Sequence, residues 1–281
     1  MAESQEYERH PRATVNRLKA RGKYDYSTIH TILNSTPILH VSFPANGDDP
    51  FPALLPMLGC TGSYPPPPPP PTPPSAPGSF PEDSDLNLLA EDPASGPKNI
   101  YLHGHSSARL FRSSAGPLPV TIAATSMQGV VLALSPFHNS CNYASVVVHG
   151  YASPVTDEAE RLYALTRITD NLVPGRWGRS RNPPTKAEMT TTGVLRVDIA
   201  SASAKVRVGG PNDDRHDLRD EAVVGSVWTG VVPCWLQFGN PVESGHNKVK
   251  GVPSYLTEWV ENENERGRSV AIMAVEGSSP K

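Results

Sequence analysis

The pattern of apolar and polar positions predicts a chain of short strands with a few helices. Apolar and polar residues alternate over residues 38–43, and turn residues such as Gln128-Gly129 separate later apolar runs. Strands joined by short turns are typical of an antiparallel meander or barrel. We therefore expect a mainly β (α+β) fold with peripheral helices, and its strands are predicted at 38–43, 53–58, 99–102, 120–125, 130–135, 145–155, 194–199 and 223–232.

Helical periodicity predicts several short helices between these strands. One covers residues 27–33, and a longer one covers 156–172, where apolar residues form a stripe after an acidic first turn. Another helix begins near Thr185, where Glu188 completes a capping box. A last amphipathic piece covers 255–260, and we expect the last ten or so residues of the chain to be disordered.

Proline changes this picture in one region. The chain has 31 prolines among 281 residues, and Pro65–Pro71 is an unbroken run. Such a composition cannot pack a core and favours extended or disordered chain. We expect an inserted, disordered loop at about 60–98, and we expect deletion of 65–95 to leave folding intact. The loop is either an inert spacer or a ligand for an SH3-type partner.

Charge and cysteine content exclude several classes of protein. The net charge is −3, which argues against a nucleic-acid binder, and no apolar run reaches the length of a membrane span. Cys60, Cys141 and Cys234 lie far apart, without a paired motif. This pattern fits reduced thiols, so we expect a cytoplasmic protein without a metal centre.

The most informative chemistry lies within residues 99–111. A strand ends at His103-Gly104, and a helix is predicted to start at Ser106 and Ser107, with Arg109 beside them. A helix N-terminus with two hydroxyls and a guanidinium is suited to a phosphate or another anion. The alternative is that the serines only cap a helix and that Arg109 faces water.

A second polar stretch precedes the long apolar strand at 145–155. Asn142 and Ser145 could bond a ligand there, or they could belong to a well-capped turn. His103 and His105 lie two residues apart, but no third ligand is spaced to complete a metal site. Motifs of phosphate-binding loops, nucleophile elbows and zinc proteases are absent from the sequence.

Eight short segments occur in a recurring order: RGKYD (21–25), ILHVSF (38–43), LPM (55–57), YLHG (101–104), NYASVVV (142–148), PGRW (174–177), SAKVR (203–207) and VWTGVVP (227–233). In this order they resemble the FMN-binding split-barrel superfamily, and most closely its pyridoxamine 5′-phosphate oxidase-like branch that includes the nitroimidazole-resistance (Nim) proteins. The resemblance covers about 20–235 apart from the proline insert. It implies an antiparallel split β-barrel of the FMN-binding type over 21–239, a flexible arm over 1–20, and a C-terminal helix with a disordered tail over 240–281.

The resemblance also implies a site for FMN at a homodimer interface. The phosphate would contact Ser106, Ser107 and Arg109, and the partner subunit's Trp228 would cover the flavin ring. The implied cofactor-binding residues are Pro56, Met57, His103, Gly104, His105, Ser106, Ser107, Arg109, Asn142, Tyr143, Ser145 and Trp228.

The implied activity is that of an FMN-dependent oxidoreductase. His103 would be the catalytic residue, as a proton donor or a substrate anchor, with a small-molecule acceptor and NAD(P)H as a donor. The chain departs from the family at Ala144, where relatives often carry an arginine. Two alternatives therefore stay open: a haem-binding protein with His103 as the axial ligand, and a cofactor-free scaffold.

Overall fold

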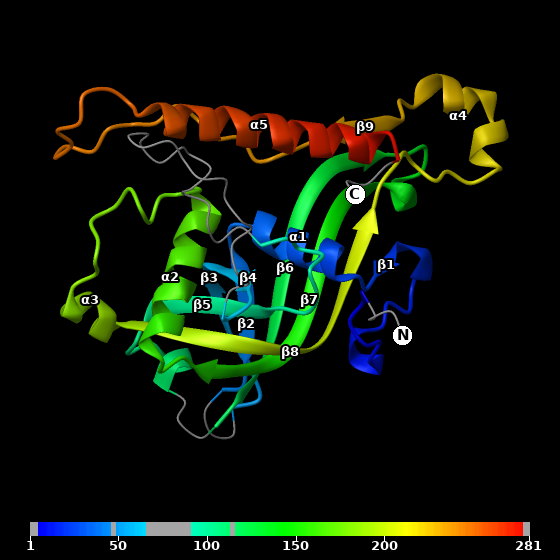
Figure 1. Cartoon of the computed structure of the whole chain (residues 1–281). Coiled ribbons are helices and arrows are strands. Elements are labelled where there is room, and N and C mark those ends of the chain that lie inside the picture. Colours follow the sequence, from blue (N-terminus) through cyan, green and yellow to red (C-terminus); the bar gives the residue numbers. More distant parts are fainter. Residues whose placement is uncertain (1–4, 46–48, 66–90, 113–115, 278–281) are drawn as a thin grey trace. The chain divides into compact units, whose positions relative to one another are not determined.

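The computed structural model describes residues 5–45, 49–65, 91–112 and 116–277 (Figure 1). They fall into two compact units. The first contains Met1–Arg17, Gly22–Ala124 and Val146–Ala204, and the second contains Leu18–Arg21, Thr125–Ser145 and Lys205–Lys281.

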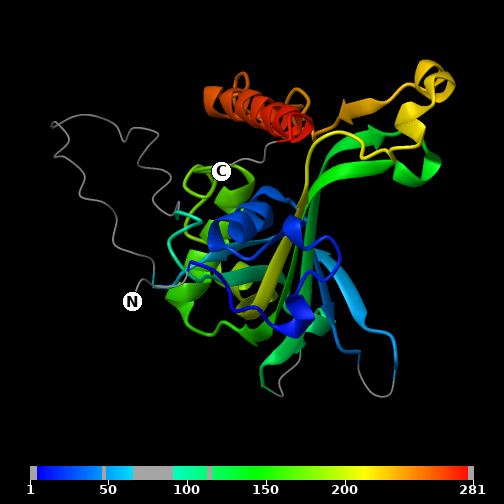
Figure 2. The same ribbon diagram turned by 90° about the vertical axis from the view of Figure 1, so that its right-hand side faces the viewer.

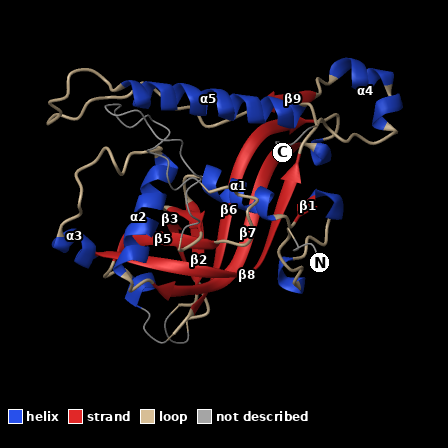
Figure 3. Cartoon of the chain, in the orientation of Figure 1, coloured by secondary structure: helices blue, strands red, loops and turns tan. Residues whose placement is uncertain are grey.

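The strands of the described chain form one mainly antiparallel sheet, drawn in red in Figure 3. Their hydrogen-bonded order is β3-β2-β6-β7-β8-β5-β4, and β9 pairs with β6. The strands are β1 (Gly22–Lys23), β2 (Leu39–Phe43), β3 (Ala53–Met57), β4 (Gly59–Gly62), β5 (Asn99–His105), β6 (Leu118–Leu132), β7 (Ser140–Pro154), β8 (Thr192–Arg207) and β9 (Gly230–Pro233).

In the first unit, the two edges of the strand order are consecutive in the chain. Leu58 alone separates β3 from β4, so the backbone passes directly from one edge to the other. Strands β2 and β3 form an antiparallel hairpin, visible in blue in Figure 2. Among the described strands, hydrogen bonds between β3 and β4 do not close the sheet. The predicted mainly antiparallel fold is confirmed, and it is consistent with a split barrel whose sheet is open.

The core of the first unit follows from strand alternation. Leu39 and Val41 of β2 are fully buried, while the intervening His40 is exposed. Helix α2 (Glu158–Leu172) packs Tyr163 and Ile168 into a buried cluster with Tyr101 of β5. Cys60, which belongs to this cluster, Cys141 and Cys234 are all free, as predicted.

The helices begin where the sequence predicts them in most cases. Asp25 caps α1 (Tyr26–Ser35) by accepting a hydrogen bond from the backbone N–H of Thr28. The predicted capping box at Thr185 and Glu188 is present at the start of α3 (Lys186–Thr191). None of the helices in the described part of the chain is both long and apolar enough to cross a bilayer.

Strand β6 is continuous where the sequence predicts two strands and a turn. Gly129 lies inside it and pairs with Pro233 of β9. A Cβ added at Gly129 would lie 2.9 Å from Val231 Cγ1, so this glycine permits close approach of the neighbouring strand. The prediction of a turn at Gln128-Gly129 is wrong. Gly129 allows a neighbouring strand to pack closely on β6, and the chain does not turn there.

The second unit corrects two further predictions. The expected strand at 223–232 is instead helix α4 (Glu221–Ser226) followed by β9, because Asp220 caps the N–H groups of Ala222 and Val223. The amphipathic piece at 255–260 is part of a longer helix, α5 (Ser254–Val275). Ala271 and Ala274 are fully buried, so disorder is wrong for this part of the tail, and 278–281 lie outside the described residues.

Both ends of the predicted proline insert belong to the first unit. Thr61 of β4 is fully buried, and Lys98 is 5% exposed. The predicted disordered insert is therefore wrong at these two ends. The prediction used the average composition of residues 60–98, which does not distinguish the end of strand β4 or the buried Lys98 from the proline-rich residues between them. Residues 66–90, with most of the proline run, lie outside the described residues. The N-terminal arm is also packed in part, since Tyr7 is 7% exposed.

Candidate functional site

The predicted cofactor turn begins at the end of β5. His103 and Gly104 pair with Val194 and Gly193 of β8. His103 is half-buried, and burial lowers the pKa of its imidazole. Neither ring nitrogen has a hydrogen-bond partner among the described residues. The imidazole is therefore neutral near pH 7 and available to a ligand.

The ring of Phe111 lies against the two paired glycines. A Cβ added at Gly193 would lie 2.5 Å from Phe111 Cδ1, and one at Gly104 would lie 2.7 Å from Phe111 Cε2. The Cβ at Gly104 would also lie 3.7 Å from Met57 Cε. We call this arrangement of Gly104, Gly193 and Phe111 the glycine notch. The glycines are needed there because an aromatic ring contacts the backbone.

The predicted helix after the two serines is a turn followed by a short 3₁₀ helix, η4 (Arg109–Arg112). The N–H of Ser106 donates to the carbonyl of Thr191 at 2.8 Å, and that of Ser107 donates to His105 Nδ1 at 3.2 Å. These groups are already bonded within the chain. The expected helix N-terminus with unpaired N–H groups is therefore wrong.

Side chains of this turn still offer groups that suit an anion. Ser107 Oγ lies 2.7 Å from His105 Nδ1, and both residues are exposed. The exposed Arg109 places its Cζ 5.3 Å from the centre of the Phe43 ring. In the described chain it has no carboxylate partner. A guanidinium that is not neutralised by an acid is suited to a phosphate.

Pro56 and Met57 lie at the end of β3 and pair with His40 and Leu39 of β2. Successive residues of a strand point to opposite faces, and Met57 is 8% exposed while Pro56 is exposed. The structure thus brings Met57, but not the side chain of Pro56, to the glycine notch.

Asn142 lies in the second unit and is fully buried. Its Nδ2 donates to the carbonyls of Gly209 and Ala274, each at 3.1 Å, and its Oδ1 accepts from Arg207 Nη1. The amide therefore joins β7 to the chain after β8 and to α5. A contact between Asn142 and a flavin stays a prediction, and it would require these bonds to rearrange.

The other predicted residues of the second unit have different surroundings. Ser145 Oγ donates to the carbonyl of Lys205 at 3.2 Å, and Tyr143 is half-buried. Trp228 is 66% exposed, and its ring lies over Gly230, where an added Cβ would be 2.6 Å from Trp228 Cη2. Its predicted role in a neighbouring subunit stays a prediction.

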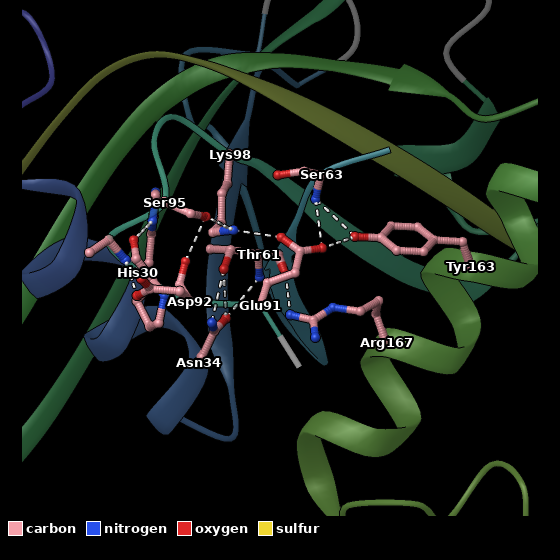
Figure 4. A network of polar contacts seen from close by, with 12 residues as sticks. His30, Asn34, Thr61, Ser63, Glu91, Asp92, Ser95, Lys98, Tyr163 and Arg167 are labelled. Atoms are coloured by element: carbon pink, nitrogen blue, oxygen red, sulfur yellow. Dashed lines mark hydrogen bonds and ion pairs between the residues drawn. The ribbon is translucent and has the colours of Figure 1, made fainter. Parts of the chain in front are cut away.

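A buried ion pair that no sequence pattern indicated lies in the first unit (Figure 4). Lys98 Nζ lies 2.5 Å from Glu91 Oε2, and the two side chains are 2% and 3% exposed. Glu91 also accepts hydrogen bonds from the Tyr163 hydroxyl and, at 3.1 Å, from the backbone N–H of Ser63. These donors hold the pKa of the Glu91 carboxyl below its usual value despite its burial. The network fixes the chain on both sides of residues 66–90.

A fully buried histidine lies beside this network. His30 Nδ1 lies 2.7 Å from the carbonyl oxygen of Pro93, and Nε2 lies 2.7 Å from the Tyr7 hydroxyl. Because a carbonyl can only accept, Nδ1 carries the proton and Nε2 accepts from Tyr7. Burial lowers the pKa of His30 to about 4, so the ring is neutral and fully bonded.

A third cluster with ligand-forming side chains lies in the second unit. Single side-chain atoms of His138, Asp214 and Asp217 lie within 4.8 Å of one another. His138 Nε2 is 3.8 Å from Asp214 Oδ2, a distance that also suits an ion pair when the ring is protonated. The cluster joins loops far apart in sequence, so spacing alone could not reveal it.

Residues 80–206 match the family model described as pyridoxamine 5′-phosphate oxidase. Among curated proteins, none matches the chain. The structure of the flavocytochrome Anf3 from Azotobacter vinelandii is 28% identical, with a TM-score of 0.67 over 89% of this chain and 97% of that one. The FAD and heme binding protein from Mycobacterium smegmatis is 23% identical and shares the fold, with a TM-score of 0.64 over 85% of this chain and 97% of that one.

Proposed function

We propose that the chain, whose residues 80–206 match the family model described as pyridoxamine 5′-phosphate oxidase, is a member of that family, binds a flavin and passes electrons through it to a small molecule. One observation carries the proposal: the likeness at 28% identity to a flavocytochrome extends over 89% of this chain. FMN is the flavin that we propose. Bound flavin supplies hydride and electron transfer, and the protein supplies position and electrostatics.

The phosphate of the flavin is assigned to the turn after β5. Arg109 offers a guanidinium without an acidic partner among the described residues, and Ser107 offers a hydroxyl on the same turn. An arginine can bond a phosphate through two parallel N–H groups, and the Ser107 hydroxyl would add a third donor once it turns away from His105 Nδ1. These groups fit an anionic ligand without any change in the strands.

The reactive end is assigned to His103. A neutral imidazole donates from one nitrogen and accepts at the other, as a substrate anchor or a proton donor requires. His103 therefore holds a proton at one ring nitrogen near pH 7 and can hydrogen-bond an acceptor molecule.

Haem is the second candidate cofactor. The observation that favours it is the half-buried, neutral imidazole of His103, whose nitrogens have no partner in the described chain. A proximal haem ligand has these properties. Of the two similar solved structures, one is described as a flavocytochrome and the other as an FAD and heme binding protein.

The test is the absorption spectrum and mass spectrum of the small molecules that copurify with the full chain. We expect a flavin spectrum that bleaches with NAD(P)H and recovers in air. A Soret band that the variant His103→Ala lacks would support haem at that residue. A colourless protein that takes up neither added FMN, FAD nor haem would refute both assignments.

The phosphate assignment has its own variant. Arg109→Ala should weaken FMN binding by about tenfold or more, because a charge-assisted bond to the phosphate is lost. Titration of the unloaded protein with FMN measures this. Arg215→Ala, which removes another exposed arginine, is the matched control and should bind like the unchanged protein. Equal weakening in both variants, or in neither, would contradict the role of Arg109.

A further inference from the structure

A cavity of about 320 Å³ in the first unit lies apart from His103 and the glycine notch. It is bounded by the ends of β2, β6 and β7 and by the N-terminal segment that carries Arg12. Phe43, Pro44, Pro119 and Val120 supply apolar lining, beside a larger polar surface from the other lining residues. These side chains give the cavity flat apolar surfaces, and its volume is at the low end for ligand sites.

The polar groups of this cavity are basic. Arg12 and His149 both line it, and His10 contacts Arg12, with His10 Nδ1 2.9 Å from Arg12 Nε. In the described part of the chain, no carboxylate forms an ion pair with Arg12. Burial first, and then the charges of Arg12 and His10, lower the pKa of His149. The guanidinium of Arg12 therefore acts on His149 across the cavity.

Hydrogen bonding leaves donors for a ligand. The Thr121 hydroxyl lies 3.0 Å from His149 Nδ1. When that hydroxyl donates, the proton of the neutral ring is on Nε2. His149 then offers an N–H, and Arg12 keeps its Nη1 donors, since its Nε and Nη2 lie 2.9 and 3.2 Å from the two ring nitrogens of His10. Ser42 adds a hydroxyl to the lining.

We propose that this cavity is a binding site for a small organic carboxylate with a flat apolar body. Arg12 and His149 bind the carboxylate, while Phe43 and the prolines contact the body of the ligand. Arginine is suited to a carboxylate through its two parallel donors, and apolar walls favour a planar hydrocarbon over water. The site is too small to hold a flavin or a haem as a whole, and the inference does not depend on the proposed function.

The test is calorimetric titration of the full chain with benzoate and, separately, with benzamide, its uncharged counterpart. We expect benzoate to bind at least tenfold more tightly than benzamide, because only benzoate carries the charge. Arg12→Gln should weaken benzoate binding by about tenfold or more, the effect of one lost charge-assisted pair. Arg9→Gln is the matched control, since Arg9 is an exposed arginine of the same segment that pairs with Glu6, and it should leave binding unchanged.

Three outcomes would overturn the site: no binding of benzoate, equal affinity for benzoate and benzamide, or equal affinity in Arg12→Gln and the unchanged protein. Flavin content is measured on the same samples. Binding of benzoate by protein that takes up no flavin or haem would support this site while refuting the proposed function. Flavin uptake without benzoate binding would refute this site and support the proposed function.

Discussion

Single residues show how burial sets charge in this protein. His30 is fully buried between Tyr7 and the carbonyl of Pro93, and both of its nitrogens are bonded in the neutral form. A proton added to Nε2 would lose the bond from Tyr7 and leave a buried charge. The folded protein therefore holds this ring neutral down to low pH, as its pKa of about 4 indicates.

This histidine predicts a pH dependence of stability. In the unfolded chain His30 titrates at its ordinary pKa of 6.5, so between pH 6.5 and about 4 only the unfolded state takes up the proton. Stability should fall as the pH is lowered through this window. The contribution of His30 to that fall is about 2 kcal/mol between pH 7 and pH 5. Urea unfolding at the two pH values measures it.

The variant His30→Gln separates this residue from the other histidines. His103 and His149, whose pKa values are also lowered, add a loss of stability of the same sign and remain in the variant. The difference in stability between pH 7 and pH 5 should shrink by about 2 kcal/mol when His30 is replaced. An undiminished difference would show that His30 is not held neutral in the fold.

At the scale of elements, the glycine notch couples β5, β8 and the turn that carries Arg109. Phe111 lies on the backbone of two strands at once, at Gly104 and Gly193. This contact fixes the end of η4 against the sheet. The position of the turn after β5 therefore depends on Gly104 and Gly193, which have no side chain, and on the ring of Phe111.

Gly193→Ala tests this coupling. The new methyl group would lie 2.5 Å from Phe111 Cδ1, close to the base of the ring, so the ring has to move. We expect a loss of about 1–3 kcal/mol in the free energy of unfolding, the usual effect of overpacking. Denaturant unfolding of the purified protein measures this loss.

The same substitution in a Phe111→Ala background is the control. Without the ring the methyl group has space, so the cost of Gly193→Ala should fall below about 1 kcal/mol. An equal cost in both backgrounds would mean that Phe111 is not what requires glycine at 193.

At the scale of the whole molecule, the surface of the second unit bears on the proposed homodimer. Trp228, Val232 and Leu236 are 66%, 50% and 61% exposed. These three side chains belong to one short segment, and exposed large apolar side chains favour an interface, with tryptophan often its main contributor. We propose that this surface, defined by Trp228, Val232 and Leu236, joins two copies of the chain.

Sedimentation of the full chain should therefore show a dimer. Trp228→Ala should raise the dissociation constant by roughly thirtyfold, which corresponds to about 2 kcal/mol at an interface hot spot. Phe51→Ala removes another exposed aromatic ring, which is 76% exposed in the first unit, and should leave the dimer unchanged. A monomer at all concentrations, or identical dissociation of both variants, would contradict this surface.

The sequence by itself determined the elements whose signals are local. The acidic first turn and apolar stripe of α2, the capping box at Thr185 and the alternation in β2 come from residues a few positions apart, and the structure has α2, α3 and β2 where these signals place them. The order of the family segments also predicted the resemblance without knowledge of contacts, and the family model described as pyridoxamine 5′-phosphate oxidase matches residues 80–206.

Only the tertiary structure decided what depends on distant partners. The sequence pattern predicts Gly129 in a turn, but Gly129 lies within strand β6 because β9 packs on it. Asn142, which reads as a ligand contact, is bonded to Gly209 and Ala274. Lys98 and Glu91, which read as parts of a solvated insert, form a buried pair. In each case a long-range contact supplies the free energy that overrides local propensity, and such contacts have no signature in a single sequence.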